Sequence, residues 1–280
     1  MNQVEFQFVR DLVRQHSGLV LTDDKHYLVE NRLMPLARQR QLKDVEELAR
    51  TLRTGGDREL IRLVVEAMTT NESLFFRDGR PFEQLKTLIL PRLFKARANT
   101  RTLRIWSAAC STGQEPYSIA MTIKELGLPL GDWRIEILGT DLSSEVLEKA
   151  RSGIYSQFEV QRGMPIQMLV KYFKQSAERW QVDSALRAMV RYQAFNLLSD
   201  PATLGRFDIV FCRNVLIYFD NPTKAKVLTG IAANMADDGV LFLGGAETVF
   251  GITDRFAPVP GERGTYACAR AGAASLRQAV

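Results

Sequence analysis

The stretch from Leu103 to Ser118, LRIWSAACSTGQEPYS, most constrains what this chain can fold into. It opens with a short apolar, β-prone run, Leu103–Trp106, which is typical of a buried parallel strand. Small residues follow as far as Gly113. The apolar residues of Gln114–Leu126 then recur at helical spacing, and Pro116 is tolerated in a first turn. The stretch therefore predicts a strand, a turn of small residues and a helix.

A strand, a turn and a helix in this order are how an open α/β sheet receives a nucleoside ligand at its strand ends. The turn holds one glycine, so it is neither the GxGxxG of dinucleotide binders nor the GxxxxGK[ST] of phosphate-binding loops. Few backbone groups would face a phosphate, which favours a nucleoside cofactor without a pyrophosphate. S-adenosylmethionine (SAM) is the obvious candidate. Taken alone, the stretch fits equally well a tight turn that packs for its own sake.

Two acidic residues strengthen the hypothesis of a nucleoside site. A second strand is predicted over Arg134–Leu138 and ends at Asp141, whose carboxylate can accept hydrogen bonds from both ribose hydroxyls. A lone Asp at a strand end is usually a helix cap, but Ser143 or Ser144 can cap the next helix and leave Asp141 for the ligand. Glu115 could hold a ligand ammonium, such as the amino group of methionine. The alternative is a Glu that the helix dipole favours in a first turn.

Five motifs of the chain resemble those of the bacterial chemotaxis receptor methyltransferases of the CheR type. These enzymes are SAM-dependent protein-glutamate O-methyltransferases, and the resemblance runs from about Phe6 to Tyr266. The motifs are TTNESLFFRD (69–78), SAACSTGQEPYS (107–118), GTDLSSEVLEKARSGIY (139–155), FNLL (195–198) and FDIVFCRNVLIYF (207–219). One departure is Gln114, where the family more often has Glu, but the neighbouring Glu115 is retained.

The resemblance implies a SAM site built from several segments of the chain. The cofactor-binding residues expected are Asn71, Ser73, Arg77, Ala109, Gly113, Glu115, Asp141, Asn196, Leu197, Arg213 and Asn214. Without the family, Asn71 and Ser73 fit a helix cap and Arg77 a solvent-exposed arginine. Asn196 can present its amide to the adenine edge while Leu197 packs on the ring, although an ordinary loop Asn fits equally well. S-adenosylhomocysteine (SAH) would be the product.

The chemistry implied is methyl transfer to the side-chain carboxylate of a receptor glutamate, which serves sensory adaptation. Such a carboxylate has a pKa of about 4.3 and is already ionised at neutral pH, so no general base is required. The enzyme must align the reacting atoms and offset desolvation of the carboxylate. We expect Arg77 to do this through a charge-assisted fork and Tyr218 through one hydroxyl donor, which makes these two the catalytic residues.

Residues 1–70 show helical patterns only, and four helices are predicted there. Arg32, Arg38, Arg40 and Lys43 cluster along the second helix and its exit. A charge run is more often just a solvated face. The resemblance implies instead that these four residues bind the cytoplasmic helical domain of a methyl-accepting chemotaxis receptor.

The fold class expected is therefore α/β: a small N-terminal helical domain, then a Rossmann-like SAM-dependent methyltransferase domain with a small antiparallel β insertion. We expect a linker over 71–85 that contributes to the SAM pocket, a methyltransferase domain over 86–270 and a disordered tail over 271–280. The insertion spans about 153–194, with strands over Phe173–Val182 and Ala188–Ala194. Some family members dock a receptor C-terminal peptide on a glycine-rich loop of this insertion. Here the turn, Gln175–Glu178, is short and has no glycine, so we expect no such tether.

Composition and charge exclude other classes of protein. The chain has 280 residues, a net charge of +5 and three widely spaced cysteines, so neither a disulfide framework nor a zinc site is indicated, and no metal is expected. No run is apolar enough to insert into a membrane, and a reducing cytoplasm fits. A nucleic-acid methyltransferase is an alternative, but Asn214 is not followed by the two prolines of the base-methylating turn. A SAM-loaded adaptor without turnover is another, and the joint presence of Arg77, Tyr218, Asp141 and Glu115 argues against it.

Overall fold

The computed structural model describes residues 1–55 and 58–269. The chain forms two compact units: the first comprises 1–70 with the short segment 218–223, and the second comprises 71–217 and the chain from 224 onward. The expected disordered tail, 271–280, lies outside the described residues. No helix within the described ranges is both long and apolar enough to cross a lipid bilayer.

The first unit is helical, as the sequence predicts. Its helices are α1 (Gln3–Ser17), α2 (His26–Gln39), α3 (Val45–Gly55) and α4 (Arg58–Met68). Each buries residues three and four apart, such as Val45, Leu48 and Leu52 of α3, in one common core. Asn2 caps the start of α1 by accepting a hydrogen bond from the Glu5 amide, which satisfies one of the free N–H groups of the first turn.

A segment from late in the chain completes this helical unit, which the sequence did not lead us to expect. Leu19 and Phe219 form an isolated antiparallel bridge, and the Val20 amide donates to the Tyr218 carbonyl over 2.9 Å. Arg14 of α1 forms an ion pair with Asp220. Tyr218 therefore belongs, by its backbone contacts, to the helical unit.

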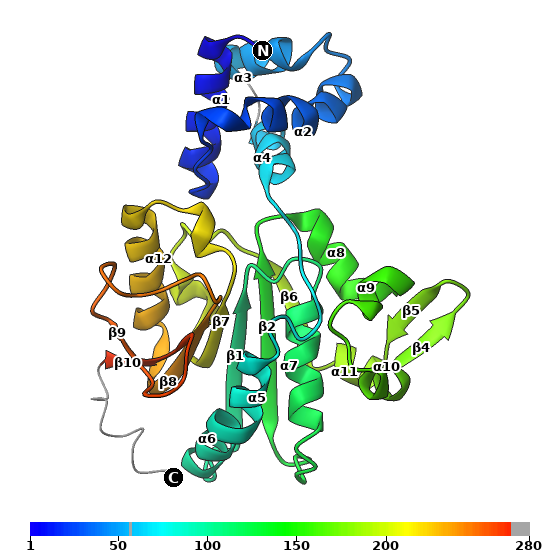
Figure 1. The fold of residues 1–280 in the computed structure, drawn as a ribbon, viewed down its shortest axis with the longest axis vertical. Coiled ribbons are helices and arrows are strands. Elements are labelled where there is room, and N and C mark those ends of the chain that lie inside the picture. Colours follow the sequence, from blue (N-terminus) through cyan, green and yellow to red (C-terminus); the bar gives the residue numbers. More distant parts are fainter. Residues whose placement is uncertain (56–57, 270–280) are drawn as a thin grey trace. The chain divides into compact units, whose positions relative to one another are not determined.

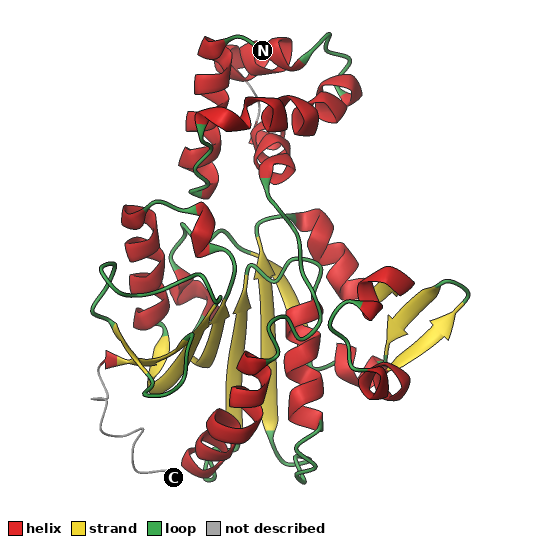
Figure 2. Cartoon of the chain, in the orientation of Figure 1, coloured by secondary structure: helices red, strands yellow, loops and turns green. Residues whose placement is uncertain are grey.

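The second unit is built on a seven-stranded sheet of order β6-β2-β1-β7-β8-β10-β9 (Figures 1 and 2). Its strands are β1 (Thr102–Ala108), β2 (Arg134–Asp141), β6 (Val190–Ala194), β7 (Phe207–Cys212), β8 (Met235–Leu243), β9 (Phe256–Pro258) and β10 (Thr265–Cys268). The first five in spatial order are parallel, and β10 is antiparallel to both of its neighbours, β8 and β9. The chain leaves β1 toward β2 on one side, and β7 lies on the other. The strand order therefore reverses at β1, which is where open α/β sheets bind ligands.

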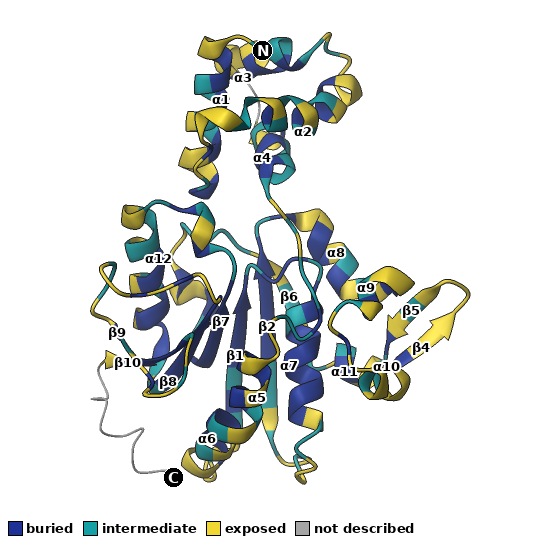
Figure 3. Cartoon of the chain, in the orientation of Figure 1, coloured by how far each residue is buried: buried dark blue, intermediate teal, exposed yellow. Residues whose placement is uncertain are grey.

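Helices cover both faces of this sheet, and the covered strands are the darkest part of Figure 3. The covering helices are α5 (Arg80–Gln84), which continues through a π-helical turn (Leu85–Ile89) into α6 (Leu90–Ala96), then α7 (Gln114–Lys124), α8 (Ser144–Ser152) and α12 (Asn221–Ala233). Leu103 and Ile105 of β1 share a core with α5–α7. Trp106 points to the other face and lines a cavity with residues of α12. All six residues of β7 are buried, which is typical of a central parallel strand that is covered on both faces.

The β insertion exists, but one of its expected strands lies elsewhere. Strands β3 (Ile154–Ser156), β5 (Arg179–Val182) and β4 (Phe173–Ser176) form a separate antiparallel sheet, flanked by α9 (Gln157–Gln161), α10 (Ile166–Tyr172) and α11 (Ser184–Arg187). The assignment of 188–194 to the insertion is wrong. That segment is β6, which pairs in parallel with β2 in the main sheet, with Ile137 opposite Val190. An alternating pattern predicts a strand but does not say which sheet the strand joins. Here α11 lies between β5 and β6, and the chain after it runs into the main sheet.

Candidate functional site

The turn after β1 has an unusual backbone. Ala109 and Ser111 have φ of 55° and 50°, and Gly113 has φ of 91°. Positive φ is costly for residues with a Cβ and persists only where surrounding structure imposes it. Here the Ser111 amide donates to Asp141 Oδ2 over 2.8 Å, and the Ser111 hydroxyl donates to the Asn71 carbonyl over 2.7 Å. The turn is therefore held from two sides, by the end of β2 and by the linker after the helical unit.

Gly113 serves close packing. A Cβ at this position would lie 2.8 Å from the Ala150 Cβ of α8 and 2.8 Å from the Tyr192 hydroxyl of β6. Only glycine fits both the space and the left-handed backbone. The alternative of a turn packed for its own sake thus has a real basis at this residue, and the expected contact of Gly113 with SAM stays a prediction.

Asp141 is buried at the end of β2, next to the turn. Besides the Ser111 amide, its carboxylate accepts the Ser143 amide, which lies 3.0 Å from Oδ1. It therefore holds together the two loops that follow β1 and β2. Ser143 stands at the N-cap position of α8, but its side chain makes no capping hydrogen bond to that helix, so the predicted capping by Ser143 is found in position only. The local role and the expected ribose role are compatible, because a carboxylate has about four acceptor positions.

Arg213 forms the electrostatic centre of the site. Its side chain is 1% exposed, and its Nη1 donates to Glu115 Oε2 over 2.9 Å while its Nη2 donates to Asp78 Oδ2 over 2.7 Å. Nη2 also donates to the Arg77 carbonyl over 2.9 Å. Glu115 accepts a further hydrogen bond from the Ser107 hydroxyl of β1. One buried guanidinium thus joins the end of β7, the first turn of α7 and the linker that carries Arg77.

Asp78 is a residue that the sequence analysis missed. Its place at the end of the motif TTNESLFFRD, directly after Arg77, is the one sequence signal that points to it. The linker around it is strained: Phe76 and Asp78 both have positive φ, of 48° and 69°. The Phe76 amide donates to the Ser118 hydroxyl of α7 over 3.0 Å. These contacts fix the backbone on both sides of Arg77.

Three residues of the linker are predicted to bind SAM. Asn71, Ser73 and Arg77 are half-buried. Within the described residues, the Arg77 guanidinium makes one long hydrogen bond, 3.3 Å from Nη1 to the Glu72 carbonyl. The Arg77 side chain is therefore held far less tightly than its backbone, which leaves it able to reach a ligand or an acceptor.

The expected adenine residues follow β6. The Phe195 amide donates to the Asp141 carbonyl over 2.9 Å, which ties this loop to the end of β2. Asn196 Oδ1 accepts the Leu198 amide over 3.0 Å and so shapes its own loop. Leu197 lines a cavity of about 360 Å³ together with Trp106 and Phe195. The structure thus brings Asn196 and Leu197 to the strand edge that carries Asp141.

The other predicted catalytic residue, Tyr218, ends a short 3₁₀ helix (Leu216–Tyr218) and lies in the helical unit. Arg213, Asn214 and Arg77 lie in the other unit. The pairing of Tyr218 with Arg77 therefore stays a prediction.

The four basic residues expected to bind a receptor differ from one another. Arg38, Arg40 and Lys43 are exposed. Arg32 is half-buried, and its Nη1 donates to the carbonyls of Met68 and Thr69 over 2.8 and 2.9 Å. Arg32 therefore caps the C-terminal end of α4. The cluster of basic residues in the sequence does not indicate this structural role.

The buried thiols of Cys110 and Cys212 are unsuited to nucleophilic or base chemistry. Burial raises the pKa of the Cys110 thiol well above its usual value, and the charges of Asp141 and Glu115 add to this. Burial likewise raises the pKa of Cys212, with Glu247 and Glu115 contributing. Both thiols stay protonated at neutral pH. No group of three or more His, Cys, Asp or Glu residues suited to a metal ion occurs in the described part of the chain.

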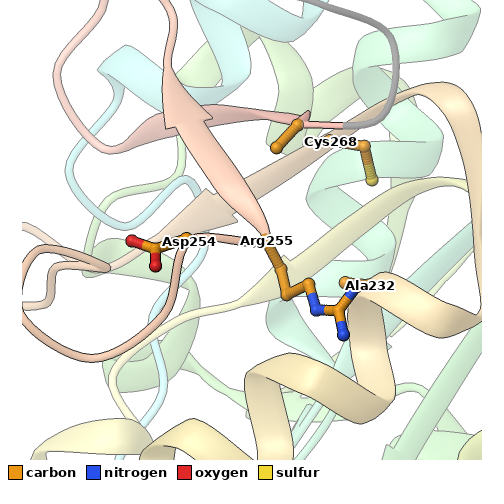
Figure 4. Close-up of a pocket in the computed structure, with 5 residues that line it drawn as sticks. Ala232, Asp254, Arg255 and Cys268 are labelled. Carbon is orange, nitrogen blue, oxygen red and sulfur yellow. The ribbon is translucent and has the colours of Figure 1, made fainter.

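A second cavity, of about 210 Å³, lies away from these residues. Figure 4 shows its lining: Ala232 on α12, Asp254 and Arg255 before β9, and Cys268 on β10, with the Arg255 side chain directed toward Ala232. None of the predicted SAM residues lines it. The strand ends of β1, β2 and β7 therefore remain the candidate active site.

Comparison with known proteins agrees with this geometry. Residues 71–265 match the family described as "CheR methyltransferase, SAM binding domain", and residues 4–69 match "CheR methyltransferase, all-alpha domain". The chain is 44% identical to Chemotaxis protein methyltransferase 1 of Pseudomonas aeruginosa, covering 91% of this chain and 94% of that protein. It is 41% identical to Chemotaxis protein methyltransferase 1 of Vibrio cholerae (90% and 93% covered) and 36% identical to the chemotaxis protein methyltransferase of Escherichia coli (91% and 88% covered).

The predicted resemblance is thereby confirmed over nearly the whole length, with the α/β fold and the all-helical N-terminal unit that it implied. The domain matched by residues 71–265 is named for SAM binding, and SAM is the cofactor. The chain belongs to the CheR methyltransferase family.

Proposed function

We propose that this chain transfers methyl groups from SAM to glutamate side chains of chemotaxis receptors, forming glutamyl methyl esters and SAH. As a member of its family the chain is a SAM-dependent methyltransferase that acts on chemotaxis receptors. The glutamate oxygen as acceptor is the finer part of the proposal. The observation that carries it is the network in which the buried Arg213 pairs with Glu115 and with the exposed Asp78, and which connects the cofactor edge of the sheet to the backbone of Arg77.

The residues present fit SAM. Asp141 is buried at the end of β2, and the half-buried Glu115 lies in the first turn of α7, where a ribose and an ammonium group would find acceptors. The Nε of Arg213 is buried and has no hydrogen-bond partner among the described residues, and an anionic group such as a ligand carboxylate suits such a donor. In this arrangement Asp141 would hold the ribose, and Glu115 with Arg213 the amino-acid end. Asn71, Ser73, Ala109, Gly113, Asn196, Leu197 and Asn214 complete the proposed site.

When bound, SAM supplies a methyl group carried on a positively charged sulfonium sulfur. After transfer of the methyl group, the sulfur is left as the neutral thioether of SAH. The acceptor glutamate is ionised at neutral pH, so this chain need not remove a proton from it. The nearest thiols, Cys110 and Cys212, are held in the protonated form by burial and by neighbouring carboxylates, and are not candidates for a base. The work left to the protein is orientation and compensation for the desolvated carboxylate.

We assign that compensation to Arg77 and Tyr218. The backbone of Arg77 is fixed by Arg213 and by the strained residues on either side, while its guanidinium makes only the long bond to Glu72 within the described chain. A fixed backbone with a movable cationic side chain suits a group that meets an incoming carboxylate. Tyr218 would add one hydroxyl donor.

We further propose that the exposed residues Arg38, Arg40 and Lys43 dock the acidic helical domain of the receptor in the cytoplasm, with Arg32 in a supporting place. The turn of the β insertion is two residues long, Ala177–Glu178, with Ala177 at φ 51°. So short a turn offers little backbone to bind a peptide. We therefore expect recognition without a C-terminal tether, and a receptor lacking its tail should be methylated at nearly the same rate.

Labelling with tritiated SAM tests this function. Purified enzyme and a receptor cytoplasmic fragment should give labelled receptor, and mild base should release the label as volatile methanol, as only a methyl ester would. Label that is stable to base would refute the glutamate oxygen as acceptor. Absence of label, with enzyme that binds SAH by calorimetry, would favour the adaptor without turnover. DNA and RNA serve as acceptor controls and should stay unlabelled.

A further inference from the structure

Glu247 makes a set of contacts that no part of the proposed reaction has yet used. It lies after β8, in the sequence Gly244–Gly245–Ala246–Glu247, and is 8% exposed. Its Oε1 accepts the amides of Val215 and Leu216 over 2.9 and 2.7 Å. Its Oε2 accepts the amides of Asn214 and Gly244 over 2.8 and 2.6 Å. One side-chain carboxylate thus receives four backbone N–H groups.

Three of these four amides are consecutive and belong to the loop that leaves β7. Asn214 has φ of 61°, a left-handed conformation that turns its amide and the next two toward one point. Successive amides arranged in this way form a concave site for an anion, and here the chain supplies its own anion. Hydrogen bonds to a charged acceptor are roughly twice as strong as neutral ones. Glu247 therefore fixes the backbone of residues 214–216 in a conformation that Asn214 would seldom adopt by itself.

The residue at 244 shows how closely the carboxylate and the loop fit together. A Cβ on Gly244 would lie 2.7 Å from Glu247 Oε2 and 3.0 Å from the Asn214 backbone nitrogen. A Cβ on the adjacent Gly245 would have no heavy atom within 4 Å. Two neighbouring glycines thus differ completely in what they permit, and only Gly244 faces Glu247.

The fixed loop starts at the residue next to Arg213. Arg213 is the first residue after β7, so the backbone direction there sets where its side chain points. The guanidinium reaches both Glu115 and Asp78 from this position, and its planar fork tolerates little displacement of the backbone. Tyr218 follows Leu216 two residues later in the sequence. We propose that Glu247 is a positioning residue of the SAM site, which sets the backbone after β7 so that Arg213 meets Glu115. This inference rests on the proposed SAM site and is independent of which group accepts the methyl.

Three variants test it, with SAH binding by calorimetry as the readout. Glu247→Gln keeps the shape of the side chain but turns one oxygen into an N–H₂ group, which must then face backbone N–H donors. Gly244→Ala leaves Glu247 in the sequence but places a Cβ 2.7 Å from its Oε2, so the carboxylate must move away from the amides. Gly245→Ala is the matched control. We expect the first two to raise the Kd for SAH by about tenfold or more, and the control to leave it unchanged.

A residue that merely fills space would give a different result. Glutamine has nearly the same volume, so a space-filling role predicts wild-type Kd for Glu247→Gln in the folded protein, and that result would overturn the inference. Binding is compared per folded site, well below each variant's Tm, so a loss of stability alone does not mimic the effect. Failure of receptor methylation by the wild type would count against the proposed acceptor and leave this comparison intact.

Should both variants fail to fold, the wild-type protein still decides the matter. Hydrogen exchange resolved to single amides should show the protons of Asn214, Val215, Leu216 and Gly244 protected, although three of them lie in a loop. Exchange of these amides at the rate of a free loop would refute the inference.

Discussion

Replacing Asp141 by alanine is the sharpest single test of the SAM site. In the structure the carboxylate accepts the Ser111 and Ser143 amides over 2.8 and 3.0 Å, and it is 6% exposed. Removing it deprives a bound ribose of its acceptor and also deprives two backbone donors of theirs. The variant should therefore lose cofactor affinity and some stability together.

The two losses have different sizes and separate readouts. A hydrogen bond to a charged acceptor contributes about 1–3 kcal/mol, which corresponds to roughly a 5- to 150-fold weaker Kd for SAM or SAH at 25 °C. Each backbone N–H left without an acceptor costs about 1–3 kcal/mol of folding free energy, and each kcal/mol lowers Tm by about 2–4 °C in a unit of this size. Titration calorimetry measures the first, and scanning calorimetry the second.

A ribose analogue isolates the contact itself. Wild type should bind SAH more tightly than its 2′-deoxy analogue, and Asp141→Ala should bind the two with nearly equal affinity, because the acceptor is already gone. Asp132→Ala removes a carboxylate that is 80% exposed and paired with Arg101, and should behave as wild type. A folded Asp141→Ala protein that still favours SAH over the deoxy analogue as strongly as wild type would refute the ribose role.

Three further predictions address catalysis, receptor docking and pH. Arg77→Ala and Tyr218→Phe should lower kcat on receptor much more than they weaken SAH binding, with Arg77 affecting both; normal turnover by Tyr218→Phe would remove the hydroxyl from the mechanism. Reversing Arg38 and Arg40 to Glu should raise the KM for receptor by roughly 2- to 30-fold at low salt and leave SAH affinity unchanged, with Arg50→Glu on α3 as the control; normal methylation by the double variant at low salt would contradict it. Arg97 donates to Asp208 and Asp238 and holds the pKa of Asp238 below its ordinary value of 3.8, so the stabilisation from this pair is present above that pH and is lost as the pH falls through the folded-state pKa. Arg97→Ala should therefore lower Tm at pH 7 by about 2–4 °C, and a Tm gap that does not narrow below pH 3.8 would count against the ion pair as its source.

The elements that the sequence predicted correctly are those with local signals. The strand, turn and helix around Gly113 and the strand ending at Asp141 follow from patterns within a dozen residues. The four helices of 1–70 do too. The resemblance to a family added the expected SAM residues.

The features that escaped prediction depend on contacts between distant residues. Arg213 and Asp78 are 135 positions apart, and Glu247 reaches amides about 32 positions away. No local periodicity reports such pairs. The placement of β6 escaped prediction for a similar reason. A strand of five residues shows the same alternation in either sheet, and its pairing with β2, which is distant in sequence, determines the sheet to which it belongs. Arg32 looked like its exposed neighbours because a charge pattern does not show what a side chain caps.

The return of the chain to the helical unit at 218–223 means that this unit is discontinuous in sequence. A cut after Thr70 would remove the partners of three residues of this unit. Leu19 would lose its bridge to Phe219, Val20 the Tyr218 carbonyl, and Arg14 the Asp220 carboxylate. The same cut would leave Tyr218 on a fragment without those partners. The N-terminal helices therefore cannot be exchanged between relatives as a free-standing cassette: a chimera that transplants 1–70 must carry 218–223 with it, and with that segment the predicted catalytic tyrosine.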